Sequence, residues 1–494
     1  MTFPSQVTAT TVESAPKSPT QYTVKINAMR SLTLSWDGWG TSLCWWANAF
    51  GERDDIADVL FTLENSVSLI GEVSKLPALG LNIVRYNVGG SSKKVIDNAG
   101  TEVAMKVPEK MVEFKFIETF WLNWMSNDSK SDSFDWDCDK NQRKMLNSAA
   151  KRDANIIEFF SNSPPWWMLI NHATAGGEEP MKDNLQKWNH AAFAFYLATV
   201  VKQAKKEWGH LVASVELFNE PSSPWWVFPK QQEGCHFEIE TQKTVLLQLR
   251  QYLDDFKLKN VVISASDENS PELALSTLSL MSKYSKVIDA IGKVNTHGYD
   301  GIKPYRGKER EPLRNLVGTL GIKKFWDSEY GDADKSGILL AESIALDINV
   351  MGVSGFVYWQ ALDGGNWGLI EADGVAGTIG SPNTKYFVMA QYSRHIRPGM
   401  TILATDDVNT VMAYHQESEV LILVTVNMEE ATTAVTFDLS GFQLAPGPVT
   451  VWTTETSGLG ALYERSQFDL PGLLVTVSIP AASVMTLEIV GARI

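Results

Sequence analysis

The chain has 494 residues, of which 44% are hydrophobic and 20% charged, a composition typical of a globular protein with a large core. Its formal net charge of −15, without any basic run, argues against a nucleic-acid partner, because phosphate binding needs clustered lysine and arginine. The sequence has no apolar run of eighteen residues and no hydrophobic segment near its N-terminus, so we expect neither a membrane span nor a signal peptide.

The predicted elements begin after an N-terminal tail. Residues 1–20 are rich in Ser, Thr and Pro and are predicted to be disordered. The alternating run at 22–27 predicts a strand, and we expect segment 21–35 to pair with a β-domain at the far end of the chain. Residues 36–382 are predicted to form a barrel, and residues 383–494 a β-sandwich side domain.

Between residues 36 and 370, short apolar segments alternate with amphipathic ones, a pattern that indicates parallel strands joined by helices. We predict eight strands, at residues 34–40, 82–88, 156–161, 214–219, 261–265, 292–297, 323–327 and 355–359. Helices are predicted at residues 185–208, 241–256 and 338–351, among others. This count is that of a (β/α)8 TIM barrel, an α/β fold. An open doubly wound sheet is the alternative, but no glycine-rich phosphate loop follows the first strand.

The C-terminal hundred residues show short alternating strands and no long helix. The strands are predicted at residues 408–414, 420–426, 434–439, 449–454, 474–479 and 484–489. This pattern predicts an antiparallel β-sandwich that also takes the N-terminal strand.

The three cysteines, Cys44, Cys138 and Cys235, are too few and too scattered for a metal site or a disulfide framework. At most one disulfide is possible. Cys138 and Cys235 form the better pair, since both lie in loop-like sequence while Cys44 follows a strand. Three free thiols are an equally good interpretation.

Two predicted strands are followed by a glutamate, Glu220 after the fourth and Glu329 after the seventh. The carboxyl ends of TIM-barrel strands form one face, so these side chains are expected to meet. Retaining hydrolysis of a glycosidic bond needs one protonated carboxyl and one carboxylate about 5 Å away, and no metal or organic cofactor. Apolar neighbours such as Phe218 and Trp225 would keep Glu220 protonated, whereas Arg85 would keep Glu329 ionised.

Other acidic residues near strand ends have simpler interpretations. Alternation along the seventh strand places Asp327 on the same side as Glu329 and deeper, where a structural hydrogen bond is expected. Glu158 and Glu216 are interpreted as barrel-interior groups paired to neighbours. Asp267 and Glu268 would line the cleft or cap the following helix, and capping is the favoured interpretation.

Many of the seventeen tryptophans follow strand-like runs, where flat rings suit stacking on sugars, although core packing would absorb some of them. The side chains predicted to bind substrate are Asp37, Trp39, Arg85, Asn87, Trp166, Asn219, His297, Tyr299, Trp359 and Asp363. Trp167 and Trp367 are further candidates. His297 is interpreted as a hydrogen-bond partner of the sugar or of a carboxylate rather than a general base, because two carboxylates already complete the mechanism.

These motifs together resemble a known family. The matching segments are residues 36–51, 82–90, 219–221, 326–331 and 358–363. They resemble glycoside hydrolase family 30 of clan A, and most of all its fungal-type endo-β-1,6-galactanases. The resemblance extends from about residue 23 to the C-terminus, and the first of these segments is the most specific.

The resemblance implies a (β/α)8 barrel joined to a β-domain built from both chain ends, and a retaining double displacement. It implies that Glu220 is the acid/base and Glu329 the nucleophile, that Asn219 contacts the sugar 2-hydroxyl, and that Arg85 supports Glu329. The long, charged segment 91–136 departs from the family pattern and bears on substrate length.

The expected partner is therefore an oligo- or polysaccharide. We expect the protein to be a monomer and to need no cofactor. β-Linked galactan is the favoured substrate. A β-glucosidase, β-xylosidase or glucuronoxylanase specificity is the alternative, and a noncatalytic sugar-binding barrel is a further one. The family implies a secreted protein, with a cytoplasmic one as the alternative.

Overall fold

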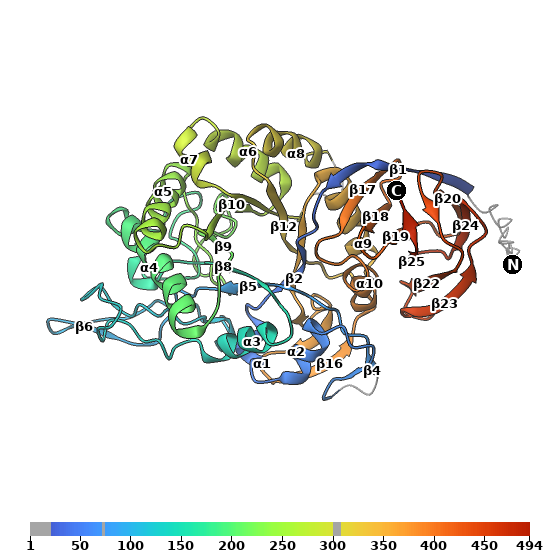
Figure 1. Cartoon of the computed structure of the whole chain (residues 1–494). Helices are drawn as coiled ribbons and strands as arrows, with labels where there is room; N and C mark the ends of the chain where they lie inside the picture. The colour runs from blue at the N-terminus through green and yellow to red at the C-terminus, as the bar shows by residue number, and fades with distance from the viewer. Residues whose placement is uncertain (1–20, 72–74, 300–307) are drawn as a thin grey trace, which may run out of the picture.

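The structure is a computed structural model that describes residues 21–71, 75–299 and 308–494. The predicted disordered tail lies outside the described residues. Two bodies stand side by side, a barrel surrounded by helices and a domain made of strands (Figure 1).

Eight parallel strands close the barrel in the order β10-β11-β12-β13-β2-β5-β8-β9. In chain order they are β2 (Gly38–Ser42), β5 (Ile83–Asn87), β8 (Ile156–Phe160), β9 (Ser214–Glu216), β10 (Val262–Glu268), β11 (Lys293–His297), β12 (Lys324–Tyr330) and β13 (Gly355–Gln360). The predicted fold class is confirmed. The main differences are that the first strand begins four residues later than predicted and that the seventh continues to Tyr330.

The barrel strands are buried on both faces because helices cover the outside and packed side chains fill the inside, so their sequences lack a polar face. The helices are α1 (Trp46–Phe50), α2 (Asp54–Phe61), α3 (Lys140–Ala150), α4 (His190–Gln203), α5 (Ile239–Asp255), α6 (Pro271–Met281), α7 (Ser285–Ala290), α8 (Arg310–Thr319), α9 (Ile338–Leu346) and α10 (Thr384–Ser393). Single π-helical turns extend two of them, η4 (Ala204–Trp208) and η5 (Asp347–Met351). Short 3-10 turns are η1 (Glu113–Lys115), η2 (Trp166–Met168) and η3 (Lys187–Asn189).

The cap of α6 corrects one prediction. Ser270 precedes the helix and its side chain accepts from the Leu273 N–H at 3.4 Å, while Pro271 occupies the first helical position. Asp267 and Glu268 therefore do not cap α6, because both are still part of β10 and their side chains are buried in other networks.

Two long connections lie at the carboxyl end of the barrel strands. The segment between β5 and α3 carries a hairpin, β6 (Ile96–Asn98) and β7 (Thr101–Val103), that projects away from the barrel (Figure 1). The segment after β13 carries a small sheet of β14 (Leu362–Asp363), β15 (Ile370–Asp373) and β16 (Thr378–Pro382). A further short pair, β3 (Val67–Ser68) and β4 (Lys75–Leu76), flanks α2.

The strand domain is one sheet in the order β23-β22-β25-β19-β18-β17-β1-β20-β24, with its own apolar core. Its strands are β1 (Gln21–Thr33), β17 (Thr401–Thr405), β18 (Thr410–His415), β19 (Val420–Asn427), β20 (Thr433–Asp438), β22 (Pro448–Glu455), β23 (Glu464–Asp469), β24 (Leu474–Ile479) and β25 (Ser483–Val490), beside the short pair β21 (Gln443–Leu444) and β26 (Ala492–Arg493). β17 and β23 were not predicted.

The N-terminal strand holds this domain together. Residues 21–25 of β1 pair with β20, and residues 26–33 pair with β17, with register shifts after Asn27 and after Ser31. The pairing with β20 is parallel, so the domain is not purely antiparallel. In Figure 1 the blue β1 runs along the red and orange strands, which shows that the two chain ends form one domain.

Helix α10 connects the two bodies. It begins just after the predicted border at residue 382 and contacts α9 of the barrel as well as β22 and β25. Gln391 on this helix donates to Thr454 Oγ1 at 2.8 Å and accepts from Thr486 Oγ1 at 2.6 Å. The helix that follows the eighth strand thus lies beyond the predicted border, although it belongs to the barrel's last strand–helix unit.

Cys44, Cys138 and Cys235 all lie in the described part of the chain and are buried, free thiols, so Cys138 and Cys235 do not form the disulfide considered above. Within the described ranges, none of the helices combines the length and the apolar character needed to cross a bilayer.

Candidate active site

Glu220 lies just beyond β9, held by an unusual backbone conformation. Its φ is +49°, in the left-handed region that non-glycine residues seldom adopt. Its N–H donates to the carbonyl oxygen of Asp267 at 2.8 Å. Such a conformation costs on the order of 1 kcal/mol and persists only where neighbouring contacts maintain it. It places the carboxyl group at the carboxyl end of the barrel strands.

Three donors surround the Glu220 carboxyl. Asn269 Nδ2 lies 2.8 Å from Oε1, and His297 Nδ1 lies 3.2 Å from the same oxygen. Trp225 Nε1 donates to Oε2 at 3.2 Å. The residue is 7% exposed, so the carboxyl is oriented by neighbours rather than by water.

A bulge in β12 turns Glu329 toward the barrel axis. Thr296 pairs with Asp327 and His297 with Glu329, so Ser328 is an extra residue in the ladder. The extra residue reverses the alternation that follows it. Asp327 consequently faces the outer layer, where Asp347 lies, and is not on the same side as Glu329, which corrects the sequence prediction. It does make the expected structural hydrogen bond, accepting from the Glu329 N–H at 3.1 Å.

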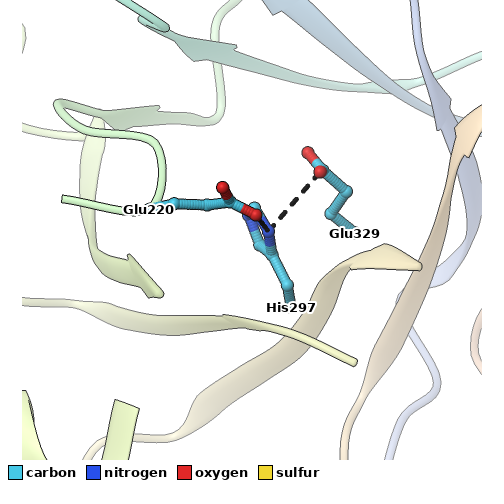
Figure 2. A group of neighbouring side chains, drawn as sticks. All are labelled: Glu220, His297 and Glu329. Atoms are coloured by element: carbon cyan, nitrogen blue, oxygen red, sulfur yellow. Dashed lines mark hydrogen bonds and ion pairs between the residues drawn. The ribbon is translucent and has the colours of Figure 1, made fainter. Parts of the chain in front are cut away.

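The two glutamates approach each other across His297. Figure 2 shows both carboxyl groups directed toward its imidazole ring. His297 Nδ1 lies 3.2 Å from Glu220 Oε1 and 3.4 Å from Glu329 Oε1, and an oxygen of each carboxyl lies within 4.8 Å of the other. This separation suits retaining hydrolysis, since inverting enzymes space their carboxyls by about 6.5 to 9.5 Å.

Arg85 supplies a buried cation to Glu329. Its Nη1 lies 3.2 Å from Glu329 Oε2, its Nη2 lies 2.5 Å from Asp267 Oδ2, and its Nε lies 3.2 Å from Glu158 Oε1. The guanidinium also lies over the Phe160 ring, 4.2 Å from its centroid. Fully buried charge of this kind is tolerated only when every partner is present.

The carboxylate of Asp267 belongs to the same network. Burial opposes its ionisation, but the charges of Arg85 and His297 outweigh burial and hold the pKa of Asp267 well below its usual range. Ser328 Oγ donates to its Oδ1 at 2.5 Å. Asp267 is therefore a buried anion beneath the two glutamates.

The environment of His297 favours its protonated form. Burial opposes its charge, but Glu329 and Asp267 together raise the pKa of His297 well above its usual value. Its Nε2 lies 3.3 Å from Asp267 Oδ2. A protonated imidazole has no lone pair to accept a proton, so this histidine acts as a hydrogen-bond donor to the carboxylates.

The charge on Glu329 is finely balanced. Burial raises the pKa of Glu329 to about 7. The charges of His297 and Arg85 lower this pKa, and the charge of Glu220 raises it. From the sequence, Arg85 is expected to keep Glu329 ionised, and that prediction leaves out the effect of burial on the pKa of Glu329. Protonation of Glu220 removes one of the negative charges that raise this pKa, so a proton on Glu220 favours ionised Glu329.

His297 and the two glutamates also have the ligand types of a metal site. A metal would require a deprotonated His297 Nδ1, whereas the surrounding anions favour the protonated ring. Hydrogen bonding within the cluster accounts for its geometry.

Both glutamates lie in a cleft of about 530 Å³. Predicted residues that line it are Asn219, Tyr299, Trp359, Asp363 and Trp367. Lining residues that were not predicted to bind substrate are Trp45, Lys115, Asn162, Trp225, Gln232, Asn269 and Gln360. Tyr299 donates to Glu329 Oε1 at 3.1 Å, and the buried Asn219 Oδ1 has no partner among the described residues.

Asp37 and Trp39 do not reach the cleft, which corrects their prediction. Asp37 precedes β2 and accepts from Lys324 Nζ at 2.8 Å, at the opposite end of the barrel. Trp39 is fully buried, and its Nε1 donates to the Ile396 carbonyl oxygen at 2.7 Å. Because β2 begins later than predicted, its carboxyl end brings Trp45 to the cleft instead.

Asn87 and Trp166 lie behind the cleft lining rather than in it. Asn87 is fully buried, donates to Glu233 Oε2 at 3.0 Å and accepts from the Asn162 N–H at 3.2 Å, so it positions a residue that does line the cleft. Trp166 is fully buried against His172. Trp167 is also buried, with its Nε1 bonded to the Trp121 carbonyl oxygen.

The predicted pairing with neighbouring groups is found for Glu158 but not for Glu216. Glu158 accepts from Arg85, Lys293 and Asn295. Glu216 is buried without a hydrogen-bond partner among the described residues, and burial raises its pKa well above the usual range. Glu216 is therefore a neutral carboxyl group.

Some lining residues carried a usable sequence signal. Trp45 follows the first strand by three residues, so a correct strand boundary would have identified it. Asn269 directly follows β10, so a correct end of the fifth strand would have identified it as well. Lys115 lies in η1 within the long connection after β5, and only the tertiary structure brings it to the cleft.

Comparisons with known proteins show the family to which the chain belongs. Residues 21–263 match the family model described as O-glycosyl hydrolase family 30. The chain is 42% identical over 461 residues to an endo-beta-1,6-galactanase of Hypocrea rufa, covering 92% of both chains.

Solved structures share the fold at low identity. A conserved exported protein from Bacteroides fragilis superposes with a TM-score of 0.75 at 19% identity, covering 95% of this chain and 100% of the other. The catalytic domain of GH30 xylanase C from Talaromyces cellulolyticus superposes with a TM-score of 0.68 at 17% identity, covering 95% and 100%. The chain belongs to O-glycosyl hydrolase family 30 and is a glycosidase.

Proposed function

We propose that the enzyme is a retaining endo-β-1,6-galactanase that cleaves β-linked galactan, such as the side chains of arabinogalactan-type polysaccharides. The observation that carries the reaction type is the separation of at most 4.8 Å between an oxygen of Glu220 and one of Glu329. The similarity to the Hypocrea rufa endo-beta-1,6-galactanase supports the choice of substrate.

The reaction proceeds in two displacements. In the first, a Glu329 carboxylate oxygen forms a bond to the anomeric carbon as the bond to the leaving oxygen breaks, and Glu220 gives its proton to that oxygen. In the second, Glu220 takes a proton from water, the water oxygen bonds to the anomeric carbon, and Glu329 leaves as a carboxylate. Two inversions restore the original configuration, and Glu220 recovers its proton.

Neighbouring donors hold Glu329 for both displacements. Tyr299 donates to Oε1 at 3.1 Å, and Arg85 Nη1 lies 3.2 Å from Oε2. These donors stabilise the carboxylate as it departs in the second step. The unpartnered Asn219 Oδ1 lies in a residue that lines the cleft, where it is available to a sugar hydroxyl.

Proton NMR of the first-formed product tests the reaction type. Hydrolysis of a β-1,6-galactooligosaccharide should release the β-anomer first, with the α-anomer growing later by mutarotation. An α-anomer formed first would overturn the retaining mechanism.

The substrate is tested separately. β-1,6-Galactan, β-1,6-glucan and β-xylan are offered at equal concentration, and product size is followed over time. Early intermediate-length galactooligosaccharides are expected from the first polymer. Preferred cleavage of another polymer would overturn the substrate but leave the reaction type, and release of a single short product from the outset would overturn endo action.

A further inference from the structure

A second groove lies beside the catalytic cleft, on the long connection between β5 and α3. It has a volume of about 670 Å³, larger than that of the cleft. Residues 91–93 and 112–118 form most of its lining, together with Asn48 and the turn between β15 and β16. The mechanism proposed above uses none of these groups.

A single stretch of chain separates this groove from the cleft. Phe114 and Phe116 line the groove, whereas Lys115 between them lines the cleft and lies 4.8 Å from the centroid of the Trp45 ring. Asn48 Nδ2 fixes this stretch, donating to the carbonyl oxygen of Phe114 at 2.9 Å and to that of Phe116 at 3.2 Å. This stretch thus lines the groove and the cleft at alternate residues and is anchored to α1.

The lining of the groove has the chemistry of a sugar site. The half-buried Phe114 supplies ring surface, and Ser92 and Glu118 supply hydrogen-bonding groups. Carbohydrate recognition combines these two kinds of group, because a sugar presents C–H faces as well as hydroxyls. Lys93 and Glu113 form an exposed ion pair of 2.5 Å at the same groove.

The groove adjoins a further cavity. This cavity, of about 390 Å³, shares Asn48 and Glu118 with the groove and adds Asp135 and Lys140. The groove and the cavity are thus both lined by residues of the 91–141 region, and Lys115 of the same region lines the cleft. Adjoining cavities of this kind suit an extended polymer better than a compact ligand.

We propose that the groove binds galactosyl units of the same polysaccharide that are remote from the bond being cleaved. The inference rests on the proposed function. A 1,6-linkage contains an additional rotatable bond, between C5 and C6, which lets the polysaccharide bend across the stretch at Lys115. Occupation of the groove makes long substrates better than short ones.

The test blocks the groove from an exposed position. Val375 lies on the turn between β15 and β16 and is 71% exposed, so Val375→Trp adds bulk to the groove without disturbing the core. Val107→Trp, at a 50% exposed position of the long connection that does not line the groove, is the matched control. The double variant Lys93→Ala, Glu113→Ala removes the exposed ion pair instead.

The measurement is kcat/KM on β-1,6-galactooligosaccharides of increasing length, starting from the shortest one cleaved. For wild type, kcat/KM should rise with length. Val375→Trp should lower it about tenfold for the longest substrates and leave the shortest unchanged, which corresponds to losing a few contacts. The double variant should lose about threefold in the same pattern, and Val107→Trp should match wild type.

Binding provides a second readout. In the Glu329→Gln background, Val375→Trp should weaken the affinity for the longest oligosaccharide about tenfold by calorimetry and leave that for the shortest unchanged. If Val375→Trp affects all lengths equally, or has no effect, the groove proposal is overturned. The proposed function is still upheld in that case as long as wild type cleaves galactan. Failure of wild type to cleave any β-1,6-galactan would overturn both.

Discussion

Arg85 and Glu329 lie 244 positions apart in the chain, yet the Arg85 Nη1 is 3.2 Å from the Glu329 Oε2 in the barrel interior. They come from β5 and β12, which are not neighbours in the barrel, so the contact crosses its interior. The same guanidinium contacts Asp267 and Glu158. The guanidinium thus contacts three carboxylates at the base of the cleft, and it shares Glu158 with Lys293 and the other two with His297.

Arg85→Met should therefore damage both stability and activity. Removing the cation leaves buried carboxylates uncompensated, which should lower the free energy of unfolding by about 3 to 5 kcal/mol. Urea unfolding measures this loss, and kcat/KM of the remaining folded enzyme should fall at least a hundredfold. Arg493→Met, which breaks an exposed ion pair with Glu419, is the control and should cost less than about 1 kcal/mol. A similar loss in both variants would contradict the role given to Arg85.

The two glutamates should fail in different ways. Glu220→Ala loses the proton donor, so kcat/KM for oligosaccharides should fall about 10²- to 10⁴-fold but much less for an aryl galactobioside with a good leaving group. Azide should restore its turnover and yield the β-galactosyl azide. Glu329→Ala should be rescued much less, and any azide product should be the α-anomer.

Analysis of the azide products by NMR distinguishes the two roles. Glu417→Gln, at an exposed position of the strand domain, is the control and should retain wild-type activity. Exchange of the two azide products between the variants would reverse the assignment of Glu220 and Glu329.

Tyr299→Phe removes one donor to Glu329 and little else. Tyr299 stacks on Tyr330 with ring centroids 6.2 Å apart, and phenylalanine preserves this packing. Loss of a hydrogen bond to a charged group should lower kcat/KM on the order of tenfold to a hundredfold. The thermal unfolding midpoint should change by no more than a few degrees, as differential scanning calorimetry would establish. Unchanged kinetics would show that the hydroxyl does not support Glu329.

The acidic limb of the pH profile should report Glu329. Burial raises the pKa of this carboxyl to about 7, and the nucleophile must be ionised to attack. We therefore expect kcat/KM to fall as the pH decreases below about 7. A profile that stays flat down to pH 5 would contradict a raised pKa. Arg85→Lys keeps the charge but changes the contacts. It should shift the acidic limb of the profile to higher pH.

Glu268 should make stability depend on pH. Burial raises its pKa to about 7, although Ser222 and Thr277 donate to it. Glu268 loses its proton near pH 4.5 in the unfolded chain but only near pH 7 in the folded chain. The protonated side chain therefore makes the folded state more stable below pH 4.5 than above pH 7. This contribution should be lost as pH rises from about 4.5 to 7, on the order of 3 kcal/mol in total.

Glu268→Gln should remove that slope. Urea unfolding of wild type and variant at several pH values between 4.5 and 7 measures it, with Glu417→Gln as a variant at an exposed site that should keep the wild-type slope. Parallel pH dependence in wild type and Glu268→Gln would contradict the raised pKa.

Local sequence patterns determined the barrel and the identity of the two glutamates. Eight apolar segments of strand length, separated by helical periodicity, have few alternatives to a parallel closed sheet. Because that fold gathers all carboxyl strand ends on one face, Glu220 and Glu329 could be placed together from their positions alone. The cleft residues Tyr299 and Trp359 followed from the same rule.

Only the tertiary structure decided how those side chains are oriented. The extra residue Ser328 turns Glu329 inward and leaves Asp327 facing outward, which strict alternation in the sequence predicts wrongly. The late start of β2 replaces Trp39 by Trp45 at the cleft. Lys115 reaches the cleft from η1, a short 3-10 turn far from any barrel strand end in the sequence. Bulges, strand register and loop paths depend on pairing between distant segments, and the local periodicity of a sequence contains no record of that pairing.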